Sequence, residues 1–313
     1  MGYFGRHHCR ILAGINGVAL MAISDTNQQA MDDVLRSHSQ RVNAMGDSPL
    51  SASIDYHQML PLVDAVVIAT PTATHGPIAL ECLRAGKHVF IEKPITSTLQ
   101  EADSIIEEAQ GRGLITQVGH VERYNPAFIR AQSLIDAPLC IETERVSPLI
   151  ERAFNIDVTL DMMIHDIDIV LSIVRSGVRS VKAVGAKVLT QKIDMARAWI
   201  EFDSGLNAIL MAGRLYPHKR RLLKVFQRET ALSVDLHNMT LTRHFKEAAS
   251  IASEDIAVDM FEPLEMELMD FVNCIRDNKQ PPVTALQARY ALELTLLIND
   301  TIKENRAYES LMI

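Results

Sequence analysis

The sequence predicts an α/β protein in which a doubly wound parallel sheet is followed by an α+β domain with a large, mostly antiparallel, open sheet. Short apolar runs alternate with helical segments throughout residues 1–120, as in βαβ units. Beyond Val178 this alternation gives way to successive strand-like segments. Since 313 residues exceed the usual size of one domain, we expect two, at 1–120 and 121–313.

The composition argues against several classes of protein. The net charge of −8 argues against binding to nucleic acid, and no apolar run is long enough to span a membrane. The start of the chain has no apolar signal-peptide segment. The four cysteines are scattered without a CxxC pair, which predicts reduced thiols in a cytoplasmic protein rather than a zinc site or a disulfide framework.

The chain opens with a partial glycine motif. Gly2 and Gly5 have the spacing of the last two glycines of G-x-G-x-x-G, and a helix can follow them to Ala13. The apolar run at 18–24 is the next predicted strand, and it ends at Asp25. The dinucleotide fingerprint places a carboxylate for the ribose hydroxyls at about this distance from the glycines. No arginine follows Asp25 directly, so NAD is favoured over NADP.

The fingerprint also needs a strand and a first glycine ahead of Gly2, and the sequence contains neither. That strand normally lies in the centre of the sheet, so its absence leaves two neighbouring strands without a partner. We therefore expect the natural start to lie upstream, for example if Met1 stands for a valine in G-V-G-Y-F-G. Upstream codons that encode no apolar strand and no glycine would contradict this expectation.

The alternation continues through the rest of the first half. Helices are expected at 32–44, 56–60, 75–85 and from about 98 to 110, the last of them capped by Thr96, Ser97 or Thr98. Strands are expected at 64–70, 88–91 and 114–120. The first of these strands ends in small polar residues, Thr70, Pro71 and Thr72, and His75 begins the helix that follows.

Glu92-Lys93-Pro94 follows the strand at 88–91. An isolated tripeptide of this kind is usually a charged surface turn. Here it lies at the carboxyl end of a parallel strand, where ligands bind in doubly wound sheets. The strand holds Lys93 on one side, and a proline of fixed φ holds it on the other. We therefore interpret Lys93 as a functional residue.

The segment 158–171 is predicted to form one buried helix that carries Asp161, His165 and Asp168 at i, i+4 and i+7. Ionisable groups on a buried helix are costly unless they are paired or functional. From this helix alone, His165 is equally well a core histidine that one of the two acids satisfies. A metal site is disfavoured because no second cluster of ligands appears. General acid–base catalysis fits better.

Beyond Val178, the pattern predicts six strands and two closing helices. The alternation at 207–212 is apolar on both faces, which favours a subunit interface on this sheet. The strands are expected at 180–189, 195–202, 206–215, 221–227, 231–236 and 240–244, and the helices at 263–278 and 284–305.

With these motifs in this order, the chain resembles the Gfo/Idh/MocA family of NAD(P)-dependent sugar and cyclitol oxidoreductases. The resemblance implies a Rossmann domain, a second α/β domain whose open sheet makes dimers or tetramers, and a catalytic set of Lys93, Asp161 and His165. It also implies that the NAD-binding residues are Gly2, Tyr3, Phe4, Gly5, Asp25, Thr70, Pro71, Thr72, His75, Glu92, Lys93 and Pro94.

A narrower likeness covers residues 119–127, which are similar to those of family members that act on UDP-sugars. This likeness implies that the enzyme oxidises a UDP-sugar to a keto sugar and that a partner aminotransferase uses this product. It also implies that Arg123, Tyr124 and Asn125 contact the nucleotide-sugar, although capping and packing explain these residues equally well. The substrate-binding residues predicted in this way are His120, Arg123, Tyr124, Asn125, Asp161 and His165.

The resulting prediction is hydride transfer from a sugar carbinol carbon to NAD. His165 takes the hydroxyl proton, Asp161 orients it, and Lys93 stabilises the developing alkoxide. The sequence leaves open whether Lys93 and His165 exchange these roles. It also leaves open two alternatives: a free-sugar or inositol dehydrogenase, and a non-catalytic regulator that binds dinucleotide or sugar.

Overall fold

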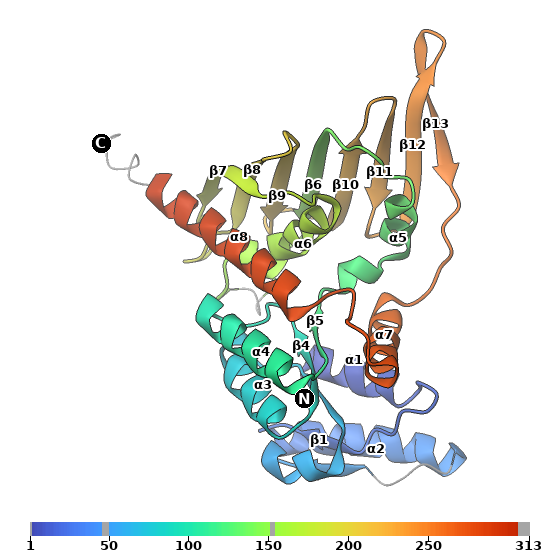
Figure 1. The fold of residues 1–313 in the computed structure, drawn as a ribbon, viewed down its shortest axis with the longest axis vertical. Coiled ribbons are helices and arrows are strands. Elements are labelled where there is room, and N and C mark those ends of the chain that lie inside the picture. Colours follow the sequence, from blue (N-terminus) through green and yellow to red (C-terminus); the bar gives the residue numbers. More distant parts are fainter. Residues whose placement is uncertain (1, 46–49, 151–153, 306–313) are drawn as a thin grey trace. The chain divides into compact units, whose positions relative to one another are not determined.

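The computed structural model describes residues 2–45, 50–150 and 154–305. The chain forms two compact units (Figure 1). Unit 1 comprises the described part of Met1–His120 together with Leu264–Arg289, and unit 2 the described part of Val121–Pro263 and of Tyr290–Ile313. The domains 1–120 and 121–313 stay a prediction, and Leu264–Arg289, which that prediction assigns to the second domain, belongs to unit 1.

Unit 1 alternates strands and helices as expected, but its strand at Ser51–Ser53 was not predicted, and the helix expected at 56–60 is a short 3-10 turn, Tyr56–Gln58. Its helices are α1 (Tyr3–Leu12), α2 (Gln28–Met45), α3 (His75–Arg84), α4 (Leu99–Arg112) and α7 (Pro263–Asp277), and its strands are β1 (Ala22–Ser24), β2 (Ser51–Ser53), β3 (Ala65–Ile68), β4 (His88–Glu92) and β5 (Thr116–Gly119). Helix α4 begins in a capping box formed by Thr98 and Glu101 and ends at Gly113 in the left-handed conformation.

The strands of unit 1 form two separate parallel sheets, β1-β2 and β3-β4-β5. In a doubly wound sheet, the strand before the glycine turn lies between the strands that correspond here to β1 and β3. The described residues supply no strand at that place, as the sequence predicts. Three of the four residues of β3 are only partly buried.

The core of unit 1 surrounds β4, whose residues Val89, Phe90 and Ile91 are fully buried. The ring of Phe90 meets the ring of Phe271 from α7 edge to face, with centroids 5.7 Å apart. Leu268 of the same helix is also buried in this cluster. Helix α7 therefore packs on the sheet β3-β4-β5, although it follows that sheet in the sequence by more than 140 residues.

Unit 2 is built on an eight-stranded sheet of order β13-β12-β11-β10-β6-β9-β8-β7. Only β6 and β9 pair in parallel. Its strands are β6 (Cys140–Val146), β7 (Val178–Ala186), β8 (Met195–Phe202), β9 (Asn207–Gly213), β10 (Arg220–Phe226), β11 (Thr230–Asp235), β12 (Thr240–Glu247) and β13 (Ser250–Ile256). Strand β13 was not predicted.

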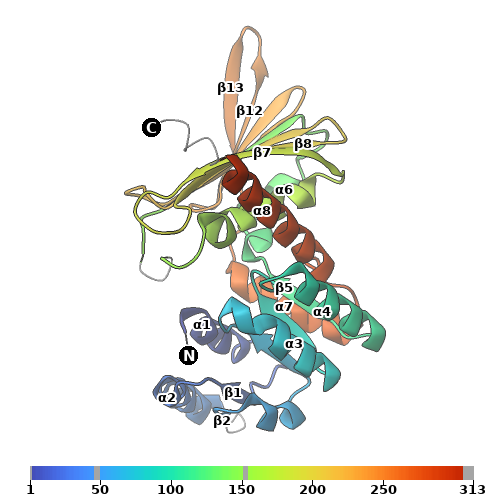
Figure 2. The ribbon, with the colours of Figure 1, turned by 90° about the vertical axis from the view of Figure 1, so that its left-hand side faces the viewer.

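Helices pack on one face of this sheet (Figures 1 and 2). Phe128 of α5 (Pro126–Gln132), Ile167 of α6 (Ile164–Ile173) and Ile298 of α8 (Ala285–Asn305) are buried in one cluster with inward-facing strand residues. On the other face, Trp199 and Val184 are exposed. Within the described residues, no helix combines the length and apolar character needed to cross a membrane.

Candidate active site

The glycine turn leads directly into α1. Gly2 is the N-cap residue, in extended conformation with φ −69° and ψ 178°, and no side chain in the described structure caps this helix end. Tyr3 and Phe4 are exposed in the first turn, while Gly5 is buried. Uncapped backbone N–H groups at a helix N-terminus attract a phosphate group, so this end of α1 fits the pyrophosphate of a dinucleotide.

Asp25 follows the last residue of β1. Its carboxylate accepts a hydrogen bond of 2.8 Å from the backbone N–H of Asn27. The hydroxyl of Ser24 donates to the carbonyl of Ser53, which joins the ends of β1 and β2. A carboxylate at the carboxyl end of this strand fits the ribose hydroxyls of NAD.

His75 lies between two of the loops that are predicted to bind NAD. It is 1% exposed. Its Nδ1 atom lies 2.9 Å from the carbonyl oxygen of Pro94, and its Nε2 atom lies 2.9 Å from that of Thr70. The structure thus brings the Thr70 loop and the Lys93 loop together. Both ring nitrogens of His75, predicted to bind cofactor, face the protein backbone.

The Glu92-Lys93-Pro94 turn begins at the end of β4, where Glu92 is in register with Gly119 of β5. The peptide bond between Lys93 and Pro94 is cis. The Glu92 carboxylate accepts a hydrogen bond of 3.2 Å from the backbone N–H of Lys93. Its other oxygen lies 2.7 Å from Nε2 of His8, a buried residue of α1 that sequence reasoning missed. The position of His8 one helical turn after Gly5 was the available signal.

In unit 2, the segment predicted as one regular helix begins instead with a π-helical turn, Thr159–Met163, which continues into α6. Asp161 lies in the wide turn and His165 in α6, and both are partly buried. Asp168 is buried and forms an ion pair of 3.5 Å with Arg123. The three residues expected on one side of a regular helix therefore differ in their surroundings. Asp161 and His165 are partly exposed, whereas Asp168 is buried in an ion pair. Such turns occur often at functional sites.

A buried charge cluster next to His165 was not predicted. Asp166 receives a bidentate hydrogen bond from Arg145 of β6, with distances of 2.8 to 3.1 Å. Arg145 also contacts Glu122 at 2.7 Å, and Glu122 contacts Arg221 of β10 at 3.1 Å. The alternation of β6, in which Ile141, Thr143 and Arg145 all face inward, was the signal for this inward arginine.

The predicted substrate-binding residues near 120–125 are mostly buried. His120 is 1% exposed and Tyr124 is 6% exposed. Asn125 accepts a hydrogen bond from the N–H of Ala127, which caps α5, and donates another of 2.8 Å to the carbonyl of Leu236. Capping and packing thus account for the side chain of Asn125 in the structure, and its contact with substrate stays a prediction.

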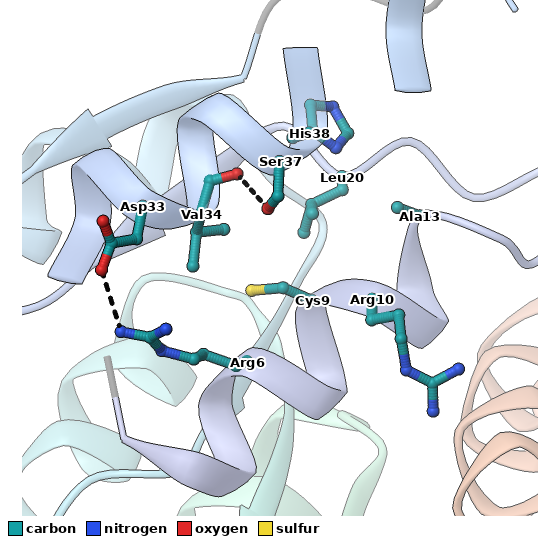
Figure 3. A pocket seen from close by; sticks show the side chains of 9 residues that line it. All are labelled: Arg6, Cys9, Arg10, Ala13, Leu20, Asp33, Val34, Ser37 and His38. Atoms are coloured by element: carbon teal, nitrogen blue, oxygen red, sulfur yellow. Dashed lines mark hydrogen bonds and ion pairs between the residues drawn. The ribbon is translucent and has the colours of Figure 1, made fainter. Parts of the chain in front are cut away.

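A cavity of about 250 Å³ lies between α1 and α2 (Figure 3). An ion pair of 3.3 Å between Arg6 and Asp33 joins the two helices across it. No predicted cofactor, substrate or catalytic residue lines this cavity, so we do not include it in the site. In the ranges the structure covers, no three His, Cys, Asp or Glu side chains are grouped to hold a metal ion.

Comparisons with known proteins identify the family of this chain. Residues 1–120 match the model of the Gfo/Idh/MocA group, described as an oxidoreductase family with an NAD-binding Rossmann fold. Over 95% of its length, the chain is 34% identical to UDP-N-acetylglucosamine 3-dehydrogenase from Acidithiobacillus ferrooxidans, of which it covers 96%. The chain belongs to the Gfo/Idh/MocA family. The predictions of this family and of a dehydrogenase are confirmed.

Other relatives place the chain among several enzymes of this class. It is 26% identical to scyllo-inositol 2-dehydrogenase (NAD⁺) from Bacillus subtilis, with 97% of this chain and 92% of that one aligned. The solved structure of the Acidithiobacillus ferrooxidans enzyme superposes with a TM-score of 0.89 at 31% identity, covering 97% of this chain and 95% of that one. The predicted two-domain α/β fold is thereby confirmed.

Proposed function

We propose that the chain oxidises a hydroxyl of the sugar ring of UDP-N-acetylglucosamine to a ketone, with NAD as the oxidant. The observation that carries this proposal is the presence of Glu92-Lys93-Pro94 and of Asp161 and His165 in a chain that is similar to UDP-N-acetylglucosamine 3-dehydrogenase over nearly its whole length. Bound NAD would supply the hydride acceptor.

The protein residues handle the proton and the charge on the substrate oxygen. In our proposal, His165 accepts the hydroxyl proton and Asp161 orients its imidazole. The Lys93 ammonium stabilises the negative charge that develops on the oxygen. Exchange of the roles of Lys93 and His165 is the alternative. The remaining predicted substrate residues, His120, Arg123, Tyr124 and Asn125, bind the nucleotide-sugar or support those that do.

The test of the proposal is NADH formation, measured by absorbance, when NAD and UDP-N-acetylglucosamine are added to the full chain. Free sugars and scyllo-inositol are assayed in parallel, because an inositol dehydrogenase aligns with almost the whole chain. Turnover of an inositol but not of the UDP-sugar would favour that second function. Binding of NADH without turnover of any compound would favour the non-catalytic regulator.

We expect Asp25 to set the preference for NAD over NADP. Its carboxylate would accept hydrogen bonds from the ribose hydroxyls and repel a 2′-phosphate. Asp25→Asn removes the charge, so we expect KM for NAD to rise about tenfold and the discrimination against NADP to fall. Steady-state kinetics with both cofactors measure this. Asp32→Asn, on α2, is the control, and equal effects of the two substitutions would contradict the assignment.

We also propose that the helix-free face of the unit 2 sheet joins copies of this chain into a dimer or tetramer. Trp199 is 41% exposed and is in register with Ile209, and Val184 is 61% exposed. Ile209→Glu places a carboxylate in this face, next to Glu142 in the register, and should yield monomers in light scattering. The control Leu286→Glu, on α8, should leave the oligomer intact. An unchanged mass for Ile209→Glu would contradict this interface.

The proposed product indicates the class of enzyme that acts next. A ketone on an amino sugar is a substrate for amino transfer, so we propose that an aminotransferase acts after this enzyme. We also keep the predicted cytoplasmic location as a proposal. The four cysteines are all free, and Cys9, Cys82 and Cys274 are buried, which agrees with a reducing compartment.

A further inference from the structure

His8 is a buried histidine with a single specific partner. It lies on α1, is 3% exposed, and has Nε2 2.7 Å from Oε1 of Glu92. No other described group forms a hydrogen bond with its Nδ1 atom, which is fully enclosed. The ring of Phe90 meets the imidazole edge to face, with centroids 5.5 Å apart. The proton of the imidazole is therefore held on Nε2, because the carboxylate is the acceptor available to it.

The Glu92 carboxylate, in turn, is fixed on several sides. Oε1 receives the hydrogen bond from His8, and the other oxygen receives the backbone N–H of Lys93. A Cβ atom added to Gly119 would lie 3.1 Å from Oε2 and 3.2 Å from Cδ, so the neighbouring strand leaves little room for this carboxylate to move. His8 thus determines where the carboxylate lies, and the carboxylate holds the first amide of the Lys93 turn.

We propose that His8 is a positioning residue that acts on Lys93 through the carboxylate of Glu92. This inference rests on the proposed catalytic role of Lys93. Without the imidazole, a largely buried carboxylate oxygen loses its donor, and the side chain must turn toward solvent or another cation. The carboxylate then releases the Lys93 amide, and the turn that presents the lysine relaxes. A displacement of about 1 Å in a catalytic group can reduce turnover about a hundredfold.

Two substitutions separate positioning from packing. His8→Leu fills similar space with an apolar side chain and removes the hydrogen-bond donor. We therefore expect kcat with UDP-N-acetylglucosamine and NAD to fall between about tenfold and a hundredfold. His8→Gln restores an N–H near the position of Nε2 and should recover most of this loss. NADH affinity, from fluorescence titration, should change less than about threefold in both. The adjacent His7→Leu is the matched control and should keep normal turnover.

A double substitution tests the route through Lys93. If His8 acts through this lysine, His8→Leu should slow the Lys93→Ala variant no further, whereas independent losses would multiply. Normal turnover of His8→Leu, equal turnover of the Leu and Gln variants, or multiplied losses would overturn the inference. If His8→Leu does not fold, as judged by circular dichroism, His8→Asn, whose amide is too short to replace Nε2, takes its place. Normal turnover of Lys93→Ala alone would instead refute the proposed role of Lys93.

Discussion

Replacement of Lys93 by alanine should reduce kcat by about a thousandfold while leaving NADH binding nearly unchanged. A cation that stabilises a developing alkoxide contributes about 10²- to 10³-fold, and any share in proton transfer adds to this. The loss should appear in kcat rather than in KM, because the alkoxide charge exists only in the transition state. Steady-state rates and NADH fluorescence titration measure the two quantities.

The matched control for this substitution is Lys87→Ala. Lys87 is a partly buried lysine of the same unit, just before β4, and should be dispensable for turnover.

His165→Ala should likewise lower kcat by about 10²- to 10⁴-fold, and substitution of the exposed His237 by alanine is its control. Near-normal turnover in both Lys93→Ala and His165→Ala would refute the proposed mechanism. A loss in only one of them would assign the main role to that residue.

Most elements of unit 1 apart from β2 could be predicted because local signals agree with the packing there. The run at 88–91 is β-rich, is bounded by Gly86 and Pro94, and becomes β4. Thr98, one of the three predicted caps, is the N-cap residue of α4, and the structure adds Glu101 to form a capping box with it. Asp25 and Lys93 accordingly lie at strand ends, as predicted.

What could not be predicted depends on contacts between distant residues. The pattern of α7 shows an amphipathic helix but not the sheet that it covers, and the contact of Phe271 with Phe90 decides that. The π-helical turn before α6 interrupts a pattern that fits a regular helix, and its Thr159 hydroxyl donates to Asn299 of α8. Strand β13 was missed because its polar sequence pairs only with β12, at the edge of the sheet.

The same limit applies to the site. Lys93 could be singled out at the end of a predicted strand, and Asp161 and His165 by their helical spacing, but their catalytic roles were implied by the family resemblance. His8 and Arg145 could not be assigned in this way, because His8 acquires its importance from Glu92 and Arg145 from Asp166 and Glu122, all of them remote in the sequence. A sequence can indicate that a charged side chain is buried, which costs free energy. Only the structure identifies the oppositely charged partner that offsets this cost.

Arg145→Met should destabilise unit 2 by about 3–5 kcal/mol at pH 7. Arg145 is the guanidinium that contacts both Asp166 and Glu122, and the side chains of all three are at most 6% exposed. Methionine fills similar space but leaves two buried carboxylates with less compensation. Urea unfolding followed by circular dichroism measures the loss. Arg179→Met, which breaks an exposed pair with Asp203, should cost less than about 1 kcal/mol.

The deficit of Arg145→Met should also shrink as the pH falls. In the wild type, burial by itself would raise the pKa of Glu122, but the charges of Arg145 and Arg221 outweigh it and hold the pKa below its ordinary value. That contribution is complete above the unfolded-state pKa and is lost as the pH falls through the folded-state pKa. Burial already raises the pKa of Asp166 in the wild type, and loss of the guanidinium raises the pKa of both Asp166 and Glu122 further, so protonation relieves them at low pH. An equal or larger deficit near pH 5 would show that lost packing, rather than lost charge compensation, destabilises the variant.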